Sequence, residues 1–253
     1  PTPPSDDKTT LTANDSYMTD GLVAGNKHAP DIPLGLTQTK INGLLVMSLA
    51  NDENAGEGSL MTFSAMRGDE SEPSSIRFNQ QVGVTMSKAL KETVKFIEMR
   101  HDAWPKGRKM EISFEEKYSL KDGPSAAVAC ALLLESAIAG EELDRSFAVT
   151  GDMNADGSVQ PVGGIGAKIR GAENQECTHV AVPLKNATSV YDYVIENGIR
   201  PIVEIQVFSI ANFDQAFTLA QKERKPEVQG SIDSFDRITN LYRDKAKNFG
   251  SSV

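Results

Sequence analysis

The sequence predicts a mixed fold of the α+β or α/β class, with short mixed sheets, packed helices, an extended N-terminal arm and an extra C-terminal helix. Strand-like and helical segments alternate through the second half of the chain, which is typical of an α/β core. Polar stretches flank this patterned region at both ends. We therefore expect an arm over residues 1–39, one folded domain over 40–221, and a linker with an amphipathic helix over 222–253.

The first half of the chain predicts a hairpin, a helix, a short strand and then an apolar helix. Two apolar runs joined by an acidic, glycine-bearing turn are typical of a hairpin. Met86, Leu90 and Val94 recur at helical spacing in the segment that follows. Gly140 comes after the apolar helix, as glycine often does at a helix end. The expected strands are 41–50, 58–67 and 109–114, and the expected helices are 82–101 and 125–139.

The second half predicts short strands separated by helices. Asp156 and Gly157 form a dipeptide that is typical of a hairpin turn. In the C-terminal segment, five apolar residues fall on one helix face, so this helix must dock on the body of the protein or on another chain. They are Ile232, Phe235, Ile238, Leu241 and Tyr242. The expected strands are 145–153, 178–184 and 201–208, and the expected helices are 165–176, 187–197 and 211–221.

Composition excludes several classes of partner. The 253 residues carry 26 basic and 35 acidic side chains, which gives a formal net charge of −9. This balance argues against nucleic acid or an anionic membrane as the main partner, because phosphate contacts need clustered Lys and Arg. We expect no membrane span, since no apolar run approaches the ~18–20 residues that cross a bilayer. The compartment stays open: cytoplasmic, or exported if a signal peptide preceded Pro1.

The two cysteines, Cys130 and Cys177, match no metal-ligand spacing, and we expect both to be free structural thiols. No motif in the chain calls for a metal ion or an organic cofactor.

Ser125 stands where the polar run at 121–125 leads into the apolar helix. It has two interpretations. The hydroxyl could cap the helix, which is worth ~1 kcal/mol. Alternatively, it could be a nucleophile, because free N–H groups at a helix start stabilise the oxyanion that forms when a serine attacks a carbonyl.

A nucleophilic serine needs a base. His28, His101 and His179 carry no supporting motif, so a Ser-His-Asp triad is disfavoured. Lys168 follows a Gly-Gly turn and has apolar or small neighbours, so burial could lower its pKa from ~10.4 and make it a general base. It could equally be an ordinary helix lysine that faces solvent. Phosphate binding by the surrounding glycines is weakly supported, because Ile169 stands where a P-loop has a hydroxyl.

Three short motifs favour the catalytic interpretations of Ser125 and Lys168. They are "KDGPSA" at 121–126, "VTGD" at 149–152 and "PVGGIGAK" at 161–168. In order and spacing they resemble the proteolytic domain of the Lon protease family, and the likeness covers roughly residues 41–220. The resemblance implies a Ser-Lys catalytic dyad, with Ser125 as nucleophile and Lys168 as general base.

The resemblance also assigns supporting roles. It implies that Thr150 helps to orient the lysine amine, although Thr150 could simply be a strand residue. Asp122 and Gly123 fall in the turn before the nucleophile, where the backbone would contribute to an oxyanion hole. Asp152 matches an acidic position to which we assign no chemistry.

Some features depart from the family. Ala127 stands where glycine is frequent, and histidines found before the turn in some members are absent. The acidic residue of the first hairpin has no clear counterpart, with Glu53 and Glu57 as nearby candidates. No Walker motif occurs in residues 1–253. We therefore expect a serine endopeptidase that by itself cleaves unfolded proteins or peptides without ATP. By resemblance alone it could form a hexameric ring.

Two other functions stay open: a non-catalytic binding or assembly module with the same fold, and a protease that processes its own arm or tail.

Overall fold

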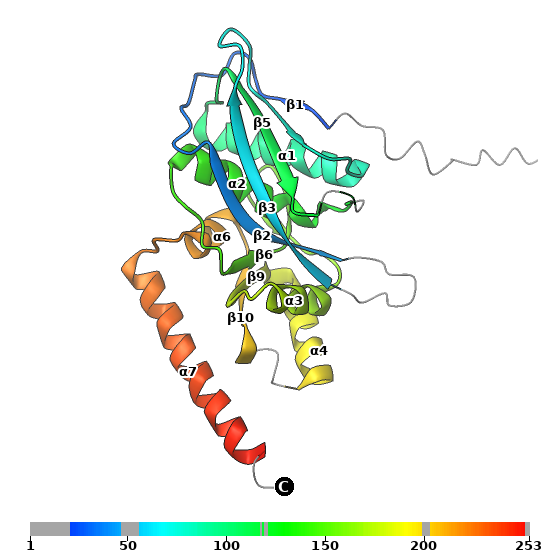
Figure 1. Cartoon of the computed structure of the whole chain (residues 1–253), viewed down its shortest axis with the longest axis vertical. Helices are drawn as coiled ribbons and strands as arrows, with labels where there is room; N and C mark the ends of the chain where they lie inside the picture. The colour runs from blue at the N-terminus through cyan, green and yellow to red at the C-terminus, as the bar shows by residue number, and fades with distance from the viewer. Residues whose placement is uncertain (1–20, 47–55, 117, 119–120, 199–202, 251–253) are drawn as a thin grey trace, which may run out of the picture.

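The computed structural model describes residues 21–46, 56–116, 118, 121–198 and 203–250. Its centre is an eight-stranded mixed sheet with strand order β1-β4-β5-β3-β2-β6-β9-β10 (Figure 1). A separate two-stranded sheet pairs β7 with β8. The strands of the large sheet are β1 (Val23–Ala24), β2 (Gln38–Val46), β3 (Gly56–Arg67), β4 (Ser75–Phe78), β5 (Arg108–Phe114), β6 (Phe147–Val149), β9 (His179–Pro183) and β10 (Gln206–Ile210).

The large sheet has an antiparallel half and a parallel half. β3 runs antiparallel to both β2 and β5, and the register of β2 with β3 ends at the pair Val46 and Gly56. This pair of strands confirms the predicted hairpin. On the other side, β2, β6, β9 and β10 run parallel to one another. Most of the strands that we expected in short sheets therefore join into one large sheet, whereas β7 and β8 form a short sheet of their own.

Helices cover both faces of the sheet. Successive side chains of a strand point to opposite faces, so Ile41 packs in the core with α1 and α2, whereas Leu44 packs in a second cluster with α3 and β9. The helices, with two short 3-10 turns, are α1 (Val84–His101), η2 (Pro124–Ala126), α2 (Ala127–Ala139), α3 (Ile165–Asn174), η3 (Leu184–Asn186), α4 (Ala187–Asn197), α6 (Phe213–Ala220) and α7 (Pro226–Gly250).

The body of the protein begins earlier than the sequence predicts. We expected an arm over 1–39, but β1 pairs with β4, and Val23 is buried with Ala29 in the core. Trp104 pairs with Asp31 and donates its indole N–H to Ser74 O at 3.0 Å. The sequence did not predict that residues 21–39 belong to the body, because they are mostly polar and only a few apolar side chains anchor them. Residues 1–20 lie outside the described residues.

Two predicted strands are shorter than expected. The strand over 145–153 is β6 followed by β7 (Asp152–Met153). Between them the Thr150 N–H still donates to Ala181 O of β9, whereas the Gly151 N–H turns to Ser125 O. β7 then pairs with β8 (Val159–Gln160), which confirms the hairpin signal between them. Of the strand expected over 201–208, residues 201–202 lie outside the described residues, 203–204 are helical, and the strand begins at Gln206.

The C-terminal helix α7 is longer than predicted, since it starts at Pro226 inside the expected linker. Proline fits the first turn of a helix, because the N–H that it lacks has no partner there. Figure 1 shows α7 extending away from the sheet. Of its five apolar residues, Ile232 is buried and the others are about half exposed.

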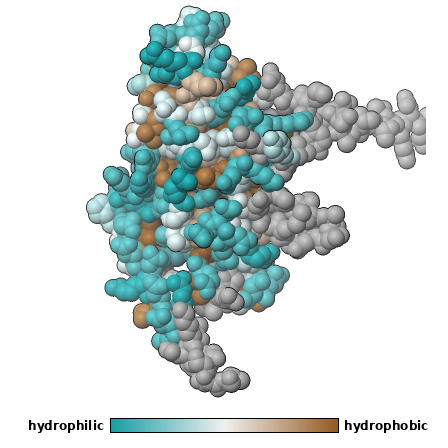
Figure 2. Space-filling view, in the orientation of Figure 1, coloured by the Kyte–Doolittle hydropathy of each residue, from teal (hydrophilic) through white to brown (hydrophobic). Residues whose placement is uncertain are grey.

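The surface seen in Figure 2 is mostly hydrophilic, with small hydrophobic patches between polar residues. Among the described residues, each helix is either too short or too polar to cross a membrane.

Candidate active site

Ser125 lies in the short turn η2, directly before α2. The residue at the N-cap of α2 is Ala126, and Ser125 makes no capping hydrogen bond to this helix. Its hydroxyl makes no hydrogen bond with any described residue. The capping interpretation of Ser125 is therefore wrong. The residue is buried, with 8% of its surface exposed.

The turn before Ser125 depends on Gly123. Its backbone angles are φ +104° and ψ 153°, a region that essentially only glycine adopts. Nothing lies within 4 Å of where a Cβ atom would stand, so the need for glycine comes from the backbone and not from crowding.

Asp122 fastens this turn to α1. Its Oδ1 accepts a hydrogen bond from the Met86 N–H at 3.1 Å, and the Gly83 N–H donates to Lys121 O at 2.8 Å. A carboxylate at a helix N-terminus satisfies free N–H groups and interacts favourably with the helix dipole. The Asp122 side chain thus caps α1, a role that sequence analysis missed because the two segments are far apart in the chain.

Thr150 and Gly151 hold the main chain of Ser125 from the other side. The Thr150 hydroxyl donates to Ser125 O at 3.3 Å, and the Gly151 N–H donates to the same oxygen at 3.0 Å. The Val128 N–H in turn donates to Gly151 O at 3.2 Å. Thr150 is fully buried and stands directly after β6, so Ser125 lies at the carboxyl edge of the parallel strands.

Lys168 lies in the first turn of α3, where it is 2% exposed. This burial lowers the pKa of its amine from 10.5 to about 8, because a low-dielectric interior disfavours the charged form. No carboxylate among the described residues forms an ion pair with it. Lys168 is therefore not the ordinary solvent-facing lysine of the alternative interpretation.

The start of α3 lies at the same edge of the sheet as Ser125. Asn186, just after β9, accepts from the Val162 N–H at 2.9 Å and donates to Val162 O at 3.0 Å. This double contact fixes the loop before Lys168 to the carboxyl end of β9, which is parallel to β6. Asn186 was missed by sequence analysis, since an asparagine between a strand and a helix gives no distinctive signal.

The predicted site residues thus come together in part. Ser125 and Thr150 are in direct contact, and Asp122 and Gly123 shape the turn before Ser125. Among the described residues, no hydrogen bond joins the Ser125 hydroxyl to the Lys168 amine. α2 and α3 cover opposite faces of the sheet, so the two side chains can meet only around its carboxyl edge.

The histidines lie elsewhere. His101 contacts Glu135 at 2.8 Å near the far end of α2, and His28 is exposed. His179 opens β9, at the opposite end of the strand from the edge that holds Ser125, and burial lowers its pKa. None of the described contacts of these residues involves Ser125, so they give the triad no support.

The remaining residues that sequence analysis considered are two cysteines and three acidic residues. Cys130 and Cys177 are free and buried, as predicted, and burial raises their pKa values to about 12 and about 11. Burial also raises the pKa of Asp152, whose carboxylate accepts from the Met153 N–H. Glu53 lies outside the described residues, and of Glu57 only its place in β3 is described. The described residues contain no cluster of three or more His, Cys, Asp or Glu side chains that could hold a metal ion.

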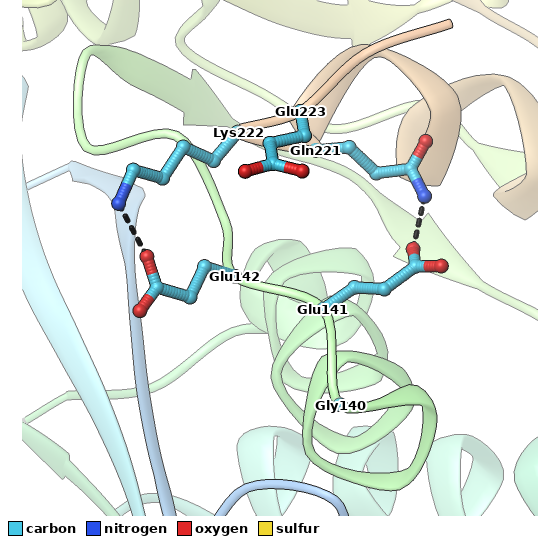
Figure 3. A pocket seen from close by; sticks show the side chains of 6 residues that line it. All are labelled: Gly140, Glu141, Glu142, Gln221, Lys222 and Glu223. Carbon is cyan, nitrogen blue, oxygen red and sulfur yellow. Dashed lines mark hydrogen bonds and ion pairs between the residues drawn. The ribbon is translucent and has the colours of Figure 1, made fainter.

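A polar hollow of about 260 Å³ lies at the opposite end of α2 from Ser125 (Figure 3). Lys222 contacts Glu142 across it, and Gln221 contacts Glu141. These pairs join the loop after α2 to the chain after α6. The hollow therefore belongs to the packing of the C-terminal region and not to the site at Ser125.

A serine that does not cap the helix it precedes, with a buried lysine on a helix that begins at the same sheet edge, fits the class of serine-type peptidases. Comparison with known proteins gives the same class. The family model of the Lon protease (S16) C-terminal proteolytic domain matches residues 32–220, and the chain belongs to this family. The family, the mixed fold and the serine-type peptidase class that the motifs implied are thereby confirmed.

Several bacterial relatives are similar over part of their length. The Lon protease of Lachnoclostridium phytofermentans is 29% identical over 193 residues, covering 76% of this chain and 22% of that protein. Lon protease 1 of Herpetosiphon aurantiacus is 23% identical over 173 residues, covering 64% and 20%. Lon protease 2 of Desulfotalea psychrophila is 28% identical over 150 residues, covering 55% and 18%. The chain thus spans about a fifth of the length of these relatives.

Proposed function

We propose that the chain is a serine endopeptidase in which Ser125 is the nucleophile and Lys168 the general base. The observation that carries this proposal is the burial of Lys168, which holds its pKa at about 8. An amine with this pKa is partly neutral at physiological pH, and only the neutral amine can accept a proton. Among the described residues Lys168 has no charged partner, and burying a lysine in this way costs free energy of folding. A role as general base offsets that cost with a function.

The reaction follows the general scheme of acyl transfer. Lys168 takes the proton of the Ser125 hydroxyl while the oxygen attacks the carbonyl carbon of the peptide bond. Backbone N–H groups of the Asp122–Ser125 turn stabilise the oxyanion. The C–N bond then breaks, the lysine returns its proton to the leaving amine, and an acyl-enzyme ester remains. Lys168 next activates a water molecule, which hydrolyses the ester and regenerates Ser125.

Thr150 supports this site as a positioning residue. Its hydroxyl holds Ser125 O in the structure, and its oxygen keeps a lone pair that could accept from the lysine amine. A closing movement of the Lys168 side chain would form both the Thr150 contact and the contact to Ser125. Catalytic hydrogen bonds are often long in a free enzyme and tighten when substrate binds.

The substrates that we propose are unfolded proteins or short peptides, cleaved without ATP by this chain itself. Residues 1–253 contain no Walker motif, which motivates cleavage without ATP. Assembly into a hexameric ring is a further part of the proposal, motivated by family membership alone. Light scattering measures the mass of the assembly.

The test compares Ser125→Ala and Lys168→Ala with the unchanged protein in the cleavage of casein. Both variants should lose cleavage by at least about a hundredfold, because each removes one half of the dyad. Lys88→Ala is the matched control, since Lys88 is an exposed lysine on α1. Circular dichroism verifies that each variant is folded. Undiminished cleavage by a folded Ser125→Ala or Lys168→Ala protein overturns the mechanism.

A fluorophosphonate probe separates this proposal from a purely binding role. Modification of Ser125 at one equivalent, and its loss in Lys168→Ala, requires an activated serine. A folded protein that the probe does not modify has no peptidase activity of the proposed kind.

A further inference from the structure

The sheet ends in an open strand edge that lies in a groove. β10 is the last strand, and it lies between α4 and α7 (Figure 1). The groove has a volume of about 330 Å³. We call it the edge groove, and it is lined by Val190, Tyr191 and Val194 from α4, by Gln206, Val207 and Phe208 from β10, and by Phe235 and Thr239 from α7.

The register of β10 determines which backbone groups face the edge groove. The Gln206 N–H donates to Thr178 O at 3.0 Å, so Gln206 points its main chain toward β9. Alternate residues of a strand point their N–H and C=O groups in opposite directions. Val207 and Ser209 therefore point theirs away from β9. Within the described residues, these groups have no hydrogen-bond partner in another strand or loop.

The sequence of β10 lacks two of the usual protections of an edge strand, although α7 contacts its Gln206 and Phe208 side chains. Exposed edge strands are commonly interrupted by proline or charged side chains, which prevent pairing with another chain. The five residues of β10 include neither. Instead, apolar side chains stand on both sides of it: Tyr191 is 66% exposed on α4, and Phe235 is 56% exposed on α7. A strand that adds to β10 would cover both.

The charges around the edge groove are mainly negative. α4 presents Asp192 and Glu196 to solvent. The adjoining hollow on α7 is lined by three aspartates and one arginine, namely Asp233, Asp236, Asp244 and Arg237, together with Asn240 and Leu241. In addition, Gln206 donates to Asp236, while its own Oε1 is buried without a partner among the described residues. This oxygen is an acceptor that a donor in the groove could satisfy.

We propose that the edge groove binds an extended segment of another protein, in which apolar residues alternate with Lys or Arg. The segment adds as a ninth strand to β10 and pairs with the main chain of Val207 and Ser209. Because successive side chains of a strand point to opposite faces, its apolar side chains contact Phe235 on the α7 side. Its Lys or Arg side chains lie on the α4 side, where their aliphatic stems cover Tyr191 and their charges face Asp192 and Glu196. A second copy of this chain is a poor occupant, because it would bring two acidic grooves together.

The site is independent of the proposed catalytic mechanism, and its test uses the full chain carrying Ser125→Ala so that no peptide is consumed. The probe is a fluorescein-labelled peptide of alternating valine and lysine, and fluorescence anisotropy measures its binding. Two further peptides are N-methylated, one at every valine and the other at every lysine. An added strand directs one of these two sets of N–H groups toward β10, so one methylated peptide should bind roughly tenfold more weakly than the other.

Variants of the protein locate the site. Val207→Pro removes one outward N–H group and leaves the bonds to β9 in place, because proline is tolerated where an edge N–H faces solvent. It should weaken binding roughly tenfold, whereas Val207→Ala, which keeps the N–H, should not. Glu196→Lys should weaken binding of the lysine peptide, and Glu72→Lys, at the opposite end of the sheet, is the charge-matched control.

Equal binding of the two N-methylated peptides overturns the proposal, since attraction by charge alone does not distinguish them. Unchanged binding by Val207→Pro overturns it as well. Sedimentation measures whether the protein without peptide is a dimer that Val207→Pro dissociates. That result identifies a second copy as the occupant and rejects the one proposed.

Discussion

The pH dependence of cleavage is the most direct test of the role of Lys168. With a pKa of about 8 instead of 10.5, about one tenth of the Lys168 side chains are neutral at pH 7, compared with about one in 3,000 for an unperturbed lysine. Burial therefore raises the active fraction about 300-fold at this pH. The cleavage rate should increase about tenfold for each pH unit below the pKa and level off above about pH 8.5.

The assay measures kcat/KM for an unstructured peptide between pH 6 and 10, together with the rate of fluorophosphonate modification. The modification reaction contains no peptide, so its rate is independent of any effect of pH on the peptide substrate. Lys168→Arg is the matched variant, because arginine keeps the positive charge but does not lose its proton. It should be inactive over the whole range, whereas Lys88→Arg should match the unchanged protein. A rate that is flat between pH 6 and 9, or that still rises tenfold per unit above pH 10, refutes the reasoning.

The same pKa predicts a pH dependence of stability. Between about pH 8 and 10.5 the unfolded chain keeps the Lys168 proton and the folded chain does not. The free energy of unfolding therefore rises with pH in this window, and the penalty for burying the charge is fully present below it. Relative to Lys168→Met, the unchanged protein should gain about 2 kcal/mol between pH 7.5 and 9.5. Urea unfolding at the two pH values measures this difference, and equal changes in both proteins contradict it.

Three substitutions test the surroundings of Ser125. Gly123→Ala should lower the free energy of unfolding by about 1–3 kcal/mol and slow fluorophosphonate modification, because alanine must adopt a backbone conformation suited to glycine; an unchanged urea midpoint contradicts this. Asp122→Ala should cost about 1–2 kcal/mol by uncapping α1, with Asp122→Asn, which keeps an acceptor oxygen, as the milder control in the same urea measurement. Thr150→Val should cost about 1 kcal/mol and slow modification of Ser125, because it removes the hydroxyl that holds Ser125 O; a modification rate equal to that of the unchanged protein rejects a positioning role for this hydroxyl.

The local pattern of the sequence determined most elements of the fold. The periodicity of 82–101 predicted α1, the Gly140 signal fixed the end of α2, and the two apolar runs predicted the pair of β2 and β3. The three short motifs at 121–126, 149–152 and 161–168 identified the family. Their fixed order and spacing are specific even where overall sequence identity is low. These features are encoded by neighbouring residues, so they can be read without knowledge of the fold.

Only the tertiary structure decided the state of each side chain at the site. The residues around Lys168 in the sequence do not distinguish it from an ordinary helix lysine. Its low pKa comes from its burial in the folded protein. Asp122 lies in the motif by sequence, yet its carboxylate caps a helix that begins 38 residues earlier, at Val84. The open edge of β10 likewise depends on strand order, which no local pattern specifies. Burial, long-range hydrogen bonds and strand order are properties of residues that are distant in sequence, and the chain brings them together only when it folds.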